Sequence, residues 1–459
     1  MSRVERPLPP GKFGLPLIGQ MPAFVKNPFQ FIEDGVADYG PVFKARLLLS
    51  KTAVITGPEA CARFIDQSLV ERAGAFPKFV ERLFGGPALP FQDGETHLRN
   101  KQIVLTGFLP EALASYLPSM QEIVERHFKE WSGKGEFHGL DGLKRLAFEV
   151  IATNFLGPMN SVELVALQKD YEVLSLGLVS TPLPLPMTPY GRALQAKRHA
   201  FDVLQKIVDA RRKSPQGDVL SRIVTARSDD GQQISSQQAV LEIHHAVLAG
   251  FVVFGQLASA VLFASRESQV REKLRAAASA LPRGKAFTIP ELGGIHYLQQ
   301  FVMEVKRLSP IIPNLFGRAK RDFELYGVRI PAGWRVLWAL RSTNIYRSSF
   351  PQRQKFDPDR YSPFPQREQE LHDRLIYVPQ SGGPVQKTHA CAGFDYSAML
   401  VSVFTAILVR DYQWQLRDPK PEYNWRSNPP EPVDGMPCKI TSSPYPAGGT
   451  VKESFESRT

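Results

Sequence analysis

Apolar residues spaced about 3.6 positions apart fill the middle of the chain and predict a mostly helical protein. The helices expected from this spacing cover residues 109–132, 142–156, 162–178, 191–213, 236–266 and 268–281. Segments rich in proline and glycine interrupt them. One such segment, residues 181–189 (TPLPLPMTP), cannot form a helix interior because each proline removes a hydrogen-bond donor and fixes φ, so we expect a surface loop there.

Apolar and β-branched residues predict a smaller β component near the N-terminus. Residues 40–57 are expected to form a hairpin that turns at Ser50 and Lys51. A short helix is expected to follow at residues 58–67. The leader before the hairpin, residues 7–20, is rich in proline and glycine and is expected to lie on the surface.

Strand-like segments return late in the chain, at residues 323–338 and as a last pair within the proline-rich stretch 418–438. Together with the helices they predict a mainly α, α+β protein with small sheets. No linker-like stretch divides the chain, so a single domain is expected over residues 1–459. Its ordered core is expected at about residues 7–445, with a flexible tail at residues 446–459.

The chain carries a formal net charge of +11, with lysine and arginine scattered among acidic residues. This scatter favours a generally basic surface, which can steer an acidic electron-transfer partner toward the protein. A nucleic-acid partner is not expected, because no basic run with interleaved aromatic residues is present.

The cysteine content indicates a reducing compartment. Cys61, Cys391 and Cys438 are odd in number and far apart, so neither a disulfide framework nor a zinc site is expected. Residues 1–10 lack the apolar stretch of a secretory signal. No uncharged apolar run of about 18 residues stands out, so no membrane anchor is expected either. These features predict a cytoplasmic protein, which we expect to be monomeric.

Cys391 lies in the most informative stretch, residues 376–400 (IYVPQSGGPVQKTHACAGFDYSAML). A glycine-rich loop precedes it and a helix-compatible apolar run follows, so its thiolate would gain from the dipole at a helix start. Gly393 lacks a β-carbon and would let a flat macrocycle approach the backbone. Taken alone, the stretch also fits a buried and inert cysteine.

A second pattern places two charges on one helix face. Glu304 and Arg307 are three residues apart, so their side chains are neighbours. Arg360 follows about fifty residues later in FDPDRY, residues 356–361, and could complete a buried charge triad. Such a triad is stable only if every donor is paired.

Taken together, these motifs resemble those of the cytochrome P450 family. The Glu304/Arg307 pair, FDPDRY and HACAG at residues 389–393 occur in the family's order, and GETHLRNK at residues 94–101 also matches. The resemblance covers roughly residues 7–440. It is greatest to the branch of cyanobacterial and animal retinoid hydroxylases. The length of the loop from VPQ to Cys391 is also similar to that of bacterial fatty-acid peroxygenases.

The resemblance implies a helical prism with small β-sheets that holds haem b, with Cys391 as the axial ligand of the iron. Glu304, Arg307 and Arg360 would form the family's structural triad. The residues implied as contacts of the haem propionates are His97, Lys101, Arg318 and His389. Buried anions do need such cations and donors. For His97 alone, a core or surface histidine is an equally good interpretation.

Two departures from the family pattern stand out. The loop carries Pro384 and Lys387 where the family usually has an aromatic residue and a glycine, so its path is uncertain from sequence. In the long helix, Ala249-Gly250 is followed by Phe251, Val252 and Val253. The family places an acid and then a threonine at the last two of these positions. A valine has no proton to give, so these positions cannot perform acid–base delivery.

The valine positions allow two interpretations. The stretch GFVVFG can be an ordinary apolar core helix, or Phe251 and Phe254 can form a dry wall beside the iron. The second interpretation resembles the allene oxide synthases, although these carry an asparagine at the place of Val252. The arginine that peroxygenases carry near this point is absent.

Three functions follow from the resemblance. The first is hydroxylation, desaturation or oxidative coupling of a lipophilic small molecule in biosynthetic or secondary metabolism, with electrons from a separate ferredoxin or flavin reductase. The second is a peroxygenase or an isomerase or dehydratase that needs no redox partner. The third is a non-catalytic haem-binding protein. Apolar segments that could contact the substrate are residues 76–92, 181–189 and 311–316.

Overall fold

The computed structural model describes residues 6–47 and 49–443, and helices dominate this part of the chain. The α-helices are α1 Met21–Lys26, α2 Pro28–Tyr39, α3 Pro58–Ile65, α4 Lys78–Phe84, α5 Gly94–Leu105, α6 Pro110–Lys134, α7 Gly139–Leu156, α8 Ser161–Leu178, α9 Pro189–Lys213, α10 Val219–Thr225, α11 Ser236–Phe251, α12 Phe254–Arg266, α13 Ser268–Ala278, α14 Ile289–Gly294, α15 His296–Leu308, α16 Leu340–Asn344, α17 Gln366–Asp373 and α18 Phe394–Asp411. Short 3-10 turns are η1 Leu89–Phe91, η2 Thr106–Phe108 and η3 Pro358–Tyr361. The predicted helical character of the middle of the chain is confirmed.

Twelve strands in the described residues form small sheets. They are β1 Val42–Leu47, β2 Ser50–Ile55, β3 Val70–Glu71, β4 Glu136–Phe137, β5 Asn314–Ala319, β6 Phe323–Leu325, β7 Val328–Ile330, β8 Arg335–Ala339, β9 Tyr412–Leu416, β10 Tyr423–Asn424, β11 Glu431–Pro432 and β12 Cys438–Ser442. The largest sheet has the order β1-β2-β8-β5-β3, in which β2 and β8 are parallel. The strands predicted at residues 323–338 and in the stretch 418–438 are confirmed.

The N-terminal hairpin forms, but its turn lies earlier than predicted. Ser50 and Lys51 belong to β2, where they pair with Leu47 and Arg46 of β1. The sequence did not reveal this because polar residues can continue a strand where their side chains face solvent, as Lys51 does here. The tail predicted to be flexible, residues 446–459, lies outside the described residues.

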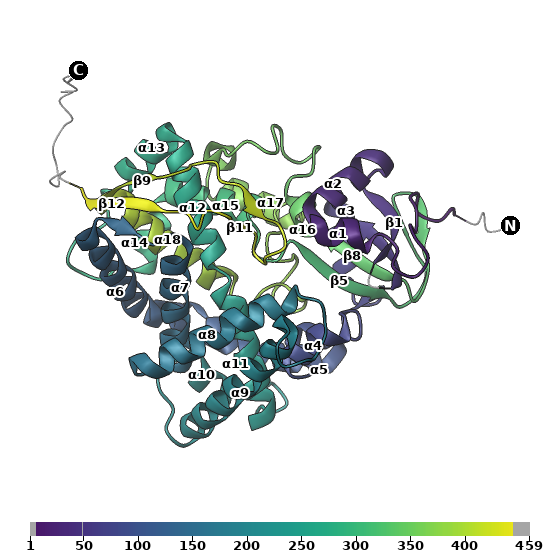
Figure 1. Ribbon diagram of the computed structural model, residues 1–459, viewed down its shortest axis with the longest axis horizontal. Coiled ribbons are helices and arrows are strands. Elements are labelled where there is room, and N and C mark those ends of the chain that lie inside the picture. The colour runs from purple at the N-terminus through teal and green to yellow at the C-terminus, as the bar shows by residue number, and fades with distance from the viewer. Residues whose placement is uncertain (1–5, 48, 444–459) are drawn as a thin grey trace.

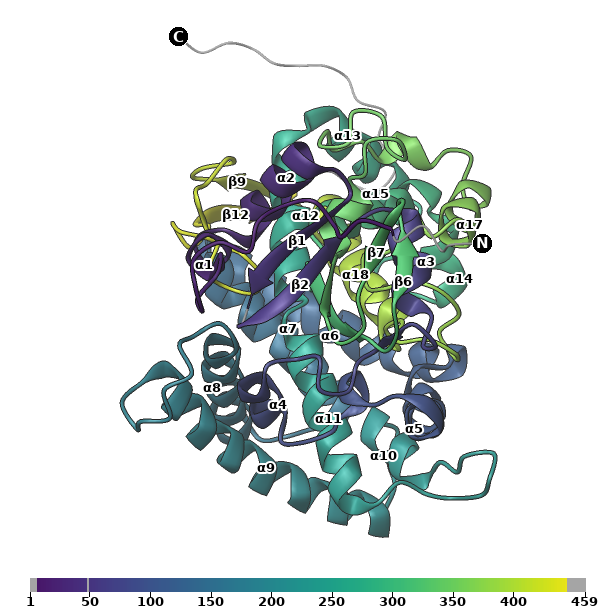
Figure 2. The same ribbon diagram turned by 90° about the vertical axis from the view of Figure 1, so that its right-hand side faces the viewer.

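The outline is triangular, with α6 to α13 at the left and bottom and the large sheet with α1 to α3 at the right (Figure 1). Figure 2 shows α11 and α12 running through the middle of the molecule. Helix α11 packs against α7 and α9, and α12 packs against α7, α15 and α18. The predicted surface loop at residues 181–189 is confirmed, with Met187 91% exposed.

The central helix is broken, contrary to the continuous helix predicted for residues 236–266. Helix α11 ends at Phe251 and α12 begins at Phe254. Between them, hydrogen bonds span three residues, from Val253 N to Gly250 O (3.0 Å) and from Gln256 N to Val253 O (2.8 Å). A tightened turn of this kind keeps the apolar spacing almost unchanged. The periodicity of the sequence therefore could not reveal it.

This central segment is also the one described helical stretch, Ser236–Arg266, that is long and apolar enough to cross a membrane. Of its most apolar window, 67% is buried inside the protein. The packing partners named above account for its hydrophobicity as that of a core helix. Length and composition alone therefore carry no argument for a membrane span here.

Glu304 is the centre of a buried charge cluster that fixes α15 to the chain between residues 344 and 361. Its carboxylate, fully buried, accepts hydrogen bonds from five donors. They are Arg307 Nε and Nη2 (both 2.7 Å), Arg360 Nε (3.0 Å), Tyr361 Oη (2.9 Å) and Asp357 N (2.9 Å). The structure thus brings Glu304, Arg307 and Arg360 together, and both arginines donate hydrogen bonds to the one carboxylate. Removing any one partner from such a cluster leaves a buried charge unpaired and destabilises the fold.

Replacing Glu304 by glutamine is expected to destabilise the protein by about 3–5 kcal/mol, because Arg307 stays buried without its counter-charge. Urea unfolding followed by circular dichroism measures this loss. Glu130→Gln is the matched control, since Glu130 pairs with Lys134 on the surface of α6. Equal unfolding midpoints for the two variants would show that the triad does not hold the fold.

Candidate functional site

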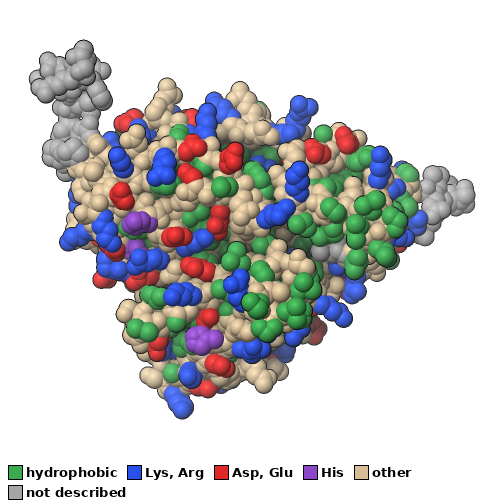
Figure 3. Space-filling view, viewed as in Figure 1, with side chains coloured by type: hydrophobic (Ala, Val, Ile, Leu, Met, Phe, Trp, Pro, Cys, Tyr) green, Lys and Arg blue, Asp and Glu red, His purple; other side chains and the backbone are tan. Residues whose placement is uncertain are grey.

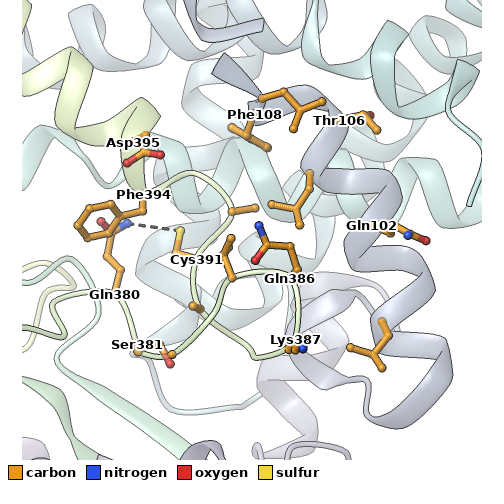
Figure 4. A pocket seen from close by; sticks show the side chains of 18 of the residues that line it. Gln102, Thr106, Phe108, Gln380, Ser381, Gln386, Lys387, Cys391, Phe394 and Asp395 are labelled. Carbon is orange, nitrogen blue, oxygen red and sulfur yellow. Dashed lines mark hydrogen bonds between the residues drawn. The ribbon is translucent and has the colours of Figure 1, made fainter. Parts of the chain in front are cut away.

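Cys391 lies in the loop that leads into α18, two residues before Gly393, which caps this helix. Its backbone N–H donates to Gln380 O (3.2 Å). Its sulfur accepts from Gln380 Nε2 (3.4 Å), as the dashed line in Figure 4 shows. The other two cysteines are buried, and burial raises the pKa of the Cys61 thiol above its usual range and that of Cys438 to about 12. Of the three, Cys391 is the cysteine placed to act as a thiolate ligand.

A chain of side chains orients the Gln380 amide toward this sulfur. Lys306 is buried on α15 and donates to Phe394 O (3.0 Å) and to Ser397 Oγ (3.1 Å). The Ser397 hydroxyl lies within hydrogen-bond distance of both Phe394 O (2.8 Å) and Gln380 Oε1 (3.1 Å). Because Lys306 also donates to Phe394 O, that carbonyl keeps a donor when the hydroxyl donates to Gln380. With its oxygen engaged, the Gln380 amide presents its N–H to Cys391.

The sequence motifs did not identify this chain of contacts. Lys306 lies inside the Glu-x-x-Arg motif, between the two residues that the motif defines. A lysine on the buried face of a helix was the available signal. Burial lowers the pKa of Lys306 to about 7, against the attraction of the nearby Cys391.

A cavity lies beside the sulfur, and four basic side chains that are close to one another border it. His97 and Lys101 come from α5, His389 from the cysteine loop and Arg72 from the segment after β3. The rings of His97 and His389 stack with centroids 3.8 Å apart. Lys101 Nζ donates to the carbonyl of Ala390, which fixes α5 to the loop.

Asp93 lies 3.9 Å from His389 Nε2 and acts on Arg72, but it leaves several donors of this group unpaired. Desolvation lowers the pKa of His97 to about 4, of His389 to about 2, of Lys101 to about 8 and of Arg72 to about 10. Both ring nitrogens of His97 and the Arg72 Nε and Nη1 atoms have no hydrogen-bond partner among the described residues. A bound anion such as a carboxylate would satisfy these donors and restore their charge.

Arg318 is not part of this group, which corrects the expectation from the sequence. Its side chain is about half exposed on β5 and pairs with Glu71 of β3, with Nη2 to Oε1 at 2.6 Å. The structure places Arg72 at the cavity instead. No sequence motif identifies Arg72. The pairing of β3 with β5 places Glu71 beside Arg318, whereas the next residue, Arg72, borders the cavity.

The far wall of the cavity is one face of α11 and of the break that follows it. Ala246, Ala249, Gly250 and Val253 line it at helical spacing. Val253 therefore faces the cavity at the place where the family has its threonine, whereas Val252 does not line it.

The aromatic wall proposed for Phe251 and Phe254 is wrong. Phe251 is buried against Phe148 of α7 (5.9 Å between centroids) and against Phe254 (5.4 Å), outside the cavity lining. This agrees with the other interpretation, an apolar core helix. Successive residues on a helix point about 100° apart, so only one face of the GFVVFG stretch can reach the cavity.

The remaining lining of the cavity is mostly apolar. Of the three segments expected to contact substrate, residues 76–92 contribute Leu89 and Pro90, and residues 311–316 contribute Ile311, Ile312 and Leu315. Residues 181–189 contribute none. The cavity suits a flat, largely apolar molecule that carries anionic groups at one edge and lies against a cysteine.

These features fit haem. The unsatisfied donors of His97 and Arg72, with Lys101 and His389, would hold its two propionates, and Cys391 would supply a thiolate ligand. Gly393 leaves room beside the sulfur, because an added β-carbon would meet Phe108 only at 3.6 Å. When bound, a thiolate-ligated haem supplies oxygen activation, since the sulfur donates electron density to the iron.

Comparisons with known proteins agree with this interpretation. The family model for cytochrome P450 matches residues 9–434. A putative cytochrome P450 120 of Synechocystis sp. is 29% identical over 95% of this chain and 97% of its own length. A beta-amyrin 28-monooxygenase of Saponaria officinalis is 28% identical over 94% of this chain and 91% of its own length. A solved cyanobacterial structure with retinoic acid bound has a TM-score of 0.85 and 30% identity, covering 96% of this chain and all of the other.

The chain belongs to the cytochrome P450 family. It is an oxidoreductase of the monooxygenase type with the fold of that family, as the resemblance implied. The predicted likeness to the retinoid-hydroxylase branch is confirmed by the cyanobacterial relative and structure.

Replacing Gln380 by leucine is expected to make the reduction potential of the bound haem more negative. Removal of an N–H donor leaves more electron density on the sulfur, which stabilises the ferric state. Ser397→Ala should shift the potential in the same direction but less, because it only frees the amide to rotate. Spectroelectrochemical titration measures both shifts.

The control is Gln386→Leu, an exposed glutamine of the same loop. It should leave the potential unchanged. If Gln380→Leu also leaves the potential unchanged, the amide does not act on the sulfur.

Proposed function

We propose that this protein uses haem b, O₂ and electrons from a separate ferredoxin or flavin reductase to hydroxylate, desaturate or couple a lipophilic small molecule. The observation that carries the proposal is the apolar cavity bounded by α11 on one side and Cys391 on the other. A substrate in this cavity would lie against the apolar wall of α11, beside the haem that these residues would hold. Biosynthetic or secondary metabolism fits this role, since one relative is named for oxidation of β-amyrin.

A route for electrons is also available. An open groove of about 970 Å³ reaches Cys391 from the side of α5 and the cysteine loop. Acidic and basic side chains both line it, including Glu95, Arg99, Asp229 and Lys387. On the face shown in Figure 3, lysine and arginine are likewise interspersed with acidic residues. A small electron-transfer protein docking there would be recognised by a mixed charge pattern, with the net charge of +11 adding long-range attraction for an acidic partner. We expect the protein to act as a monomer in the cytoplasm.

One observation favours a second candidate, a peroxygenase or an isomerase that needs no redox partner. Val253 faces the cavity where a threonine hydroxyl would handle protons, and Val252 replaces the acid. A peroxide already carries the protons that would have to be delivered to O₂. A peroxide-dependent reaction therefore does not require the acid and threonine that are missing here. In the first function, ordered water or a group of the substrate must deliver protons instead.

The choice of oxidant separates the two candidates. Purified haem-loaded protein is incubated with farnesol or retinoic acid, once with NADPH and a surrogate reductase and once with hydrogen peroxide alone. We expect oxygenated product only with the reductase. Product with peroxide alone, or a rearranged product with neither, would replace the first function by the second. Cys391→Ser is the control for haem chemistry that does not depend on the thiolate.

A further inference from the structure

The wall that α11 presents to the cavity carries two polar residues among its apolar ones, Glu242 and His245. His245 lies one helical turn before Ala249, and its ring also borders Phe84 of α4 (5.8 Å between centroids). About a quarter of its side chain stays accessible. Neither residue belongs to the group of basic side chains that fits the propionates, nor to the contacts of the sulfur.

Glu242 is held firmly in place. It is 1% exposed, its Oε2 accepts from Leu89 N (3.1 Å) and its Oε1 accepts from Gln238 Nε2 (2.6 Å). The carboxylate therefore secures the segment around η1 to α11. It also lies 3.9 Å from His245 Nδ1, measured from Oε2. This carboxylate is the nearest acidic group to the histidine ring.

The position of Glu242 determines what His245 offers to the cavity. Burial lowers the pKa of His245 to about 4, and Lys101 lowers it further, so the ring is neutral near pH 7. A neutral ring carries one proton. Burial raises the pKa of Glu242 to about 7, and above that pH its carboxylate beside Nδ1 favours the tautomer protonated there. Nε2 is then a hydrogen-bond acceptor, and the ring has no hydrogen-bond partner of its own among the described residues.

We propose that His245, oriented by Glu242, accepts a hydrogen bond from a substrate hydroxyl, so that the substrate is a lipophilic alcohol rather than a carboxylate or a plain hydrocarbon. This inference rests on the proposed function, because it takes the cavity as the substrate site. His245 is the specificity-determining residue and Glu242 its positioning residue. The oxidised carbon lies at a distance from the hydroxyl, because His245 is set back along α11 from the turn that faces the sulfur.

The charges around the cavity argue against an acidic substrate. Above pH 7, where Glu242 is ionised, a carboxylate at His245 would lie close to it, and two like charges there would repel each other. Lys101, which is near enough to lower the pKa of His245, belongs with Arg72 to the group that fits the propionates. A plain hydrocarbon, in turn, would cover Nε2 without offering it a hydrogen-bond donor, which costs free energy.

Binding to the ferric, haem-loaded protein tests the proposal without any oxidant. Farnesol, farnesal, farnesoic acid and farnesene share one chain and differ in their polar end, and each is titrated by the spectral shift of the haem. Farnesol is expected to bind about tenfold more tightly than the other three. In His245→Leu this preference should disappear while farnesene binds at least as tightly as before. Equal affinities in the wild-type protein, tighter binding of the acid, or no shift with farnesol would overturn the proposal.

Glu242→Gln tests the positioning role separately. A glutamine amide can donate to Nδ1, which moves the ring proton to Nε2 and turns the acceptor into a donor. The preference for farnesol over farnesal should then shrink or reverse, a change that mere loosening of the Leu89 segment would not produce. An unchanged preference would remove Glu242 from the proposal. His138→Leu, an exposed histidine outside the cavity, is the matched control for the histidine replacement.

This experiment and the oxidant comparison can fail independently. A farnesol preference that depends on His245 stands even if peroxide turns out to be the oxidant. A reductase-dependent oxidation stands even if His245 does not select alcohols.

Discussion

The placement of one sulfur atom, that of Cys391, is the constraint on which the rest of the structure depends. The sulfur has to face a cavity wide enough for a macrocycle and still be stabilised from behind. Helix α15 provides much of this support within one turn. Glu304 and Arg307 fix the helix to the segment that ends at η3, while Lys306 donates to Phe394 and Ser397 at the start of α18, and Ser397 contacts the Gln380 amide. The buried triad and the tuning of the sulfur are thus parts of one rigid element.

The cavity beside this sulfur is divided by chemistry. One edge collects basic groups whose burial is costly until an anion arrives, so cofactor binding and the local fold are coupled there. The opposite wall is apolar and has lost the groups that usually handle protons in this family. The two polar residues on that wall lie deeper along α11, where they can recognise a substrate but are displaced from the turn at Val253. In the proposal made above, the residues that recognise the substrate thus lie apart from Val252 and Val253, the positions of the family's proton-handling pair.

Much of this arrangement could be predicted from the sequence, because several of its features leave clear patterns within short stretches of the chain. Helical periodicity, the Glu304/Arg307 spacing and the loop before Cys391 are encoded by neighbours in the chain. Contacts between segments that are distant in the chain are not encoded in this local way. Arg72 in place of Arg318, and the amide of Gln380 on the sulfur, depend on strand pairing and on side-chain direction. The break at Val252 was hidden because a tightened turn preserves the apolar pattern. Phe251 was misplaced because the sequence does not show which face of α11 borders the cavity.

The most direct test of the account is the spectrum of the reduced protein with carbon monoxide bound, recorded for the wild-type protein and for Cys391→Ser. The account predicts the red-shifted Soret band of a thiolate-ligated haem in the wild-type protein and its loss in the variant. A wild-type protein without that band, or a variant that keeps both the band and its activity, would contradict the assignment of Cys391 and with it the function proposed here.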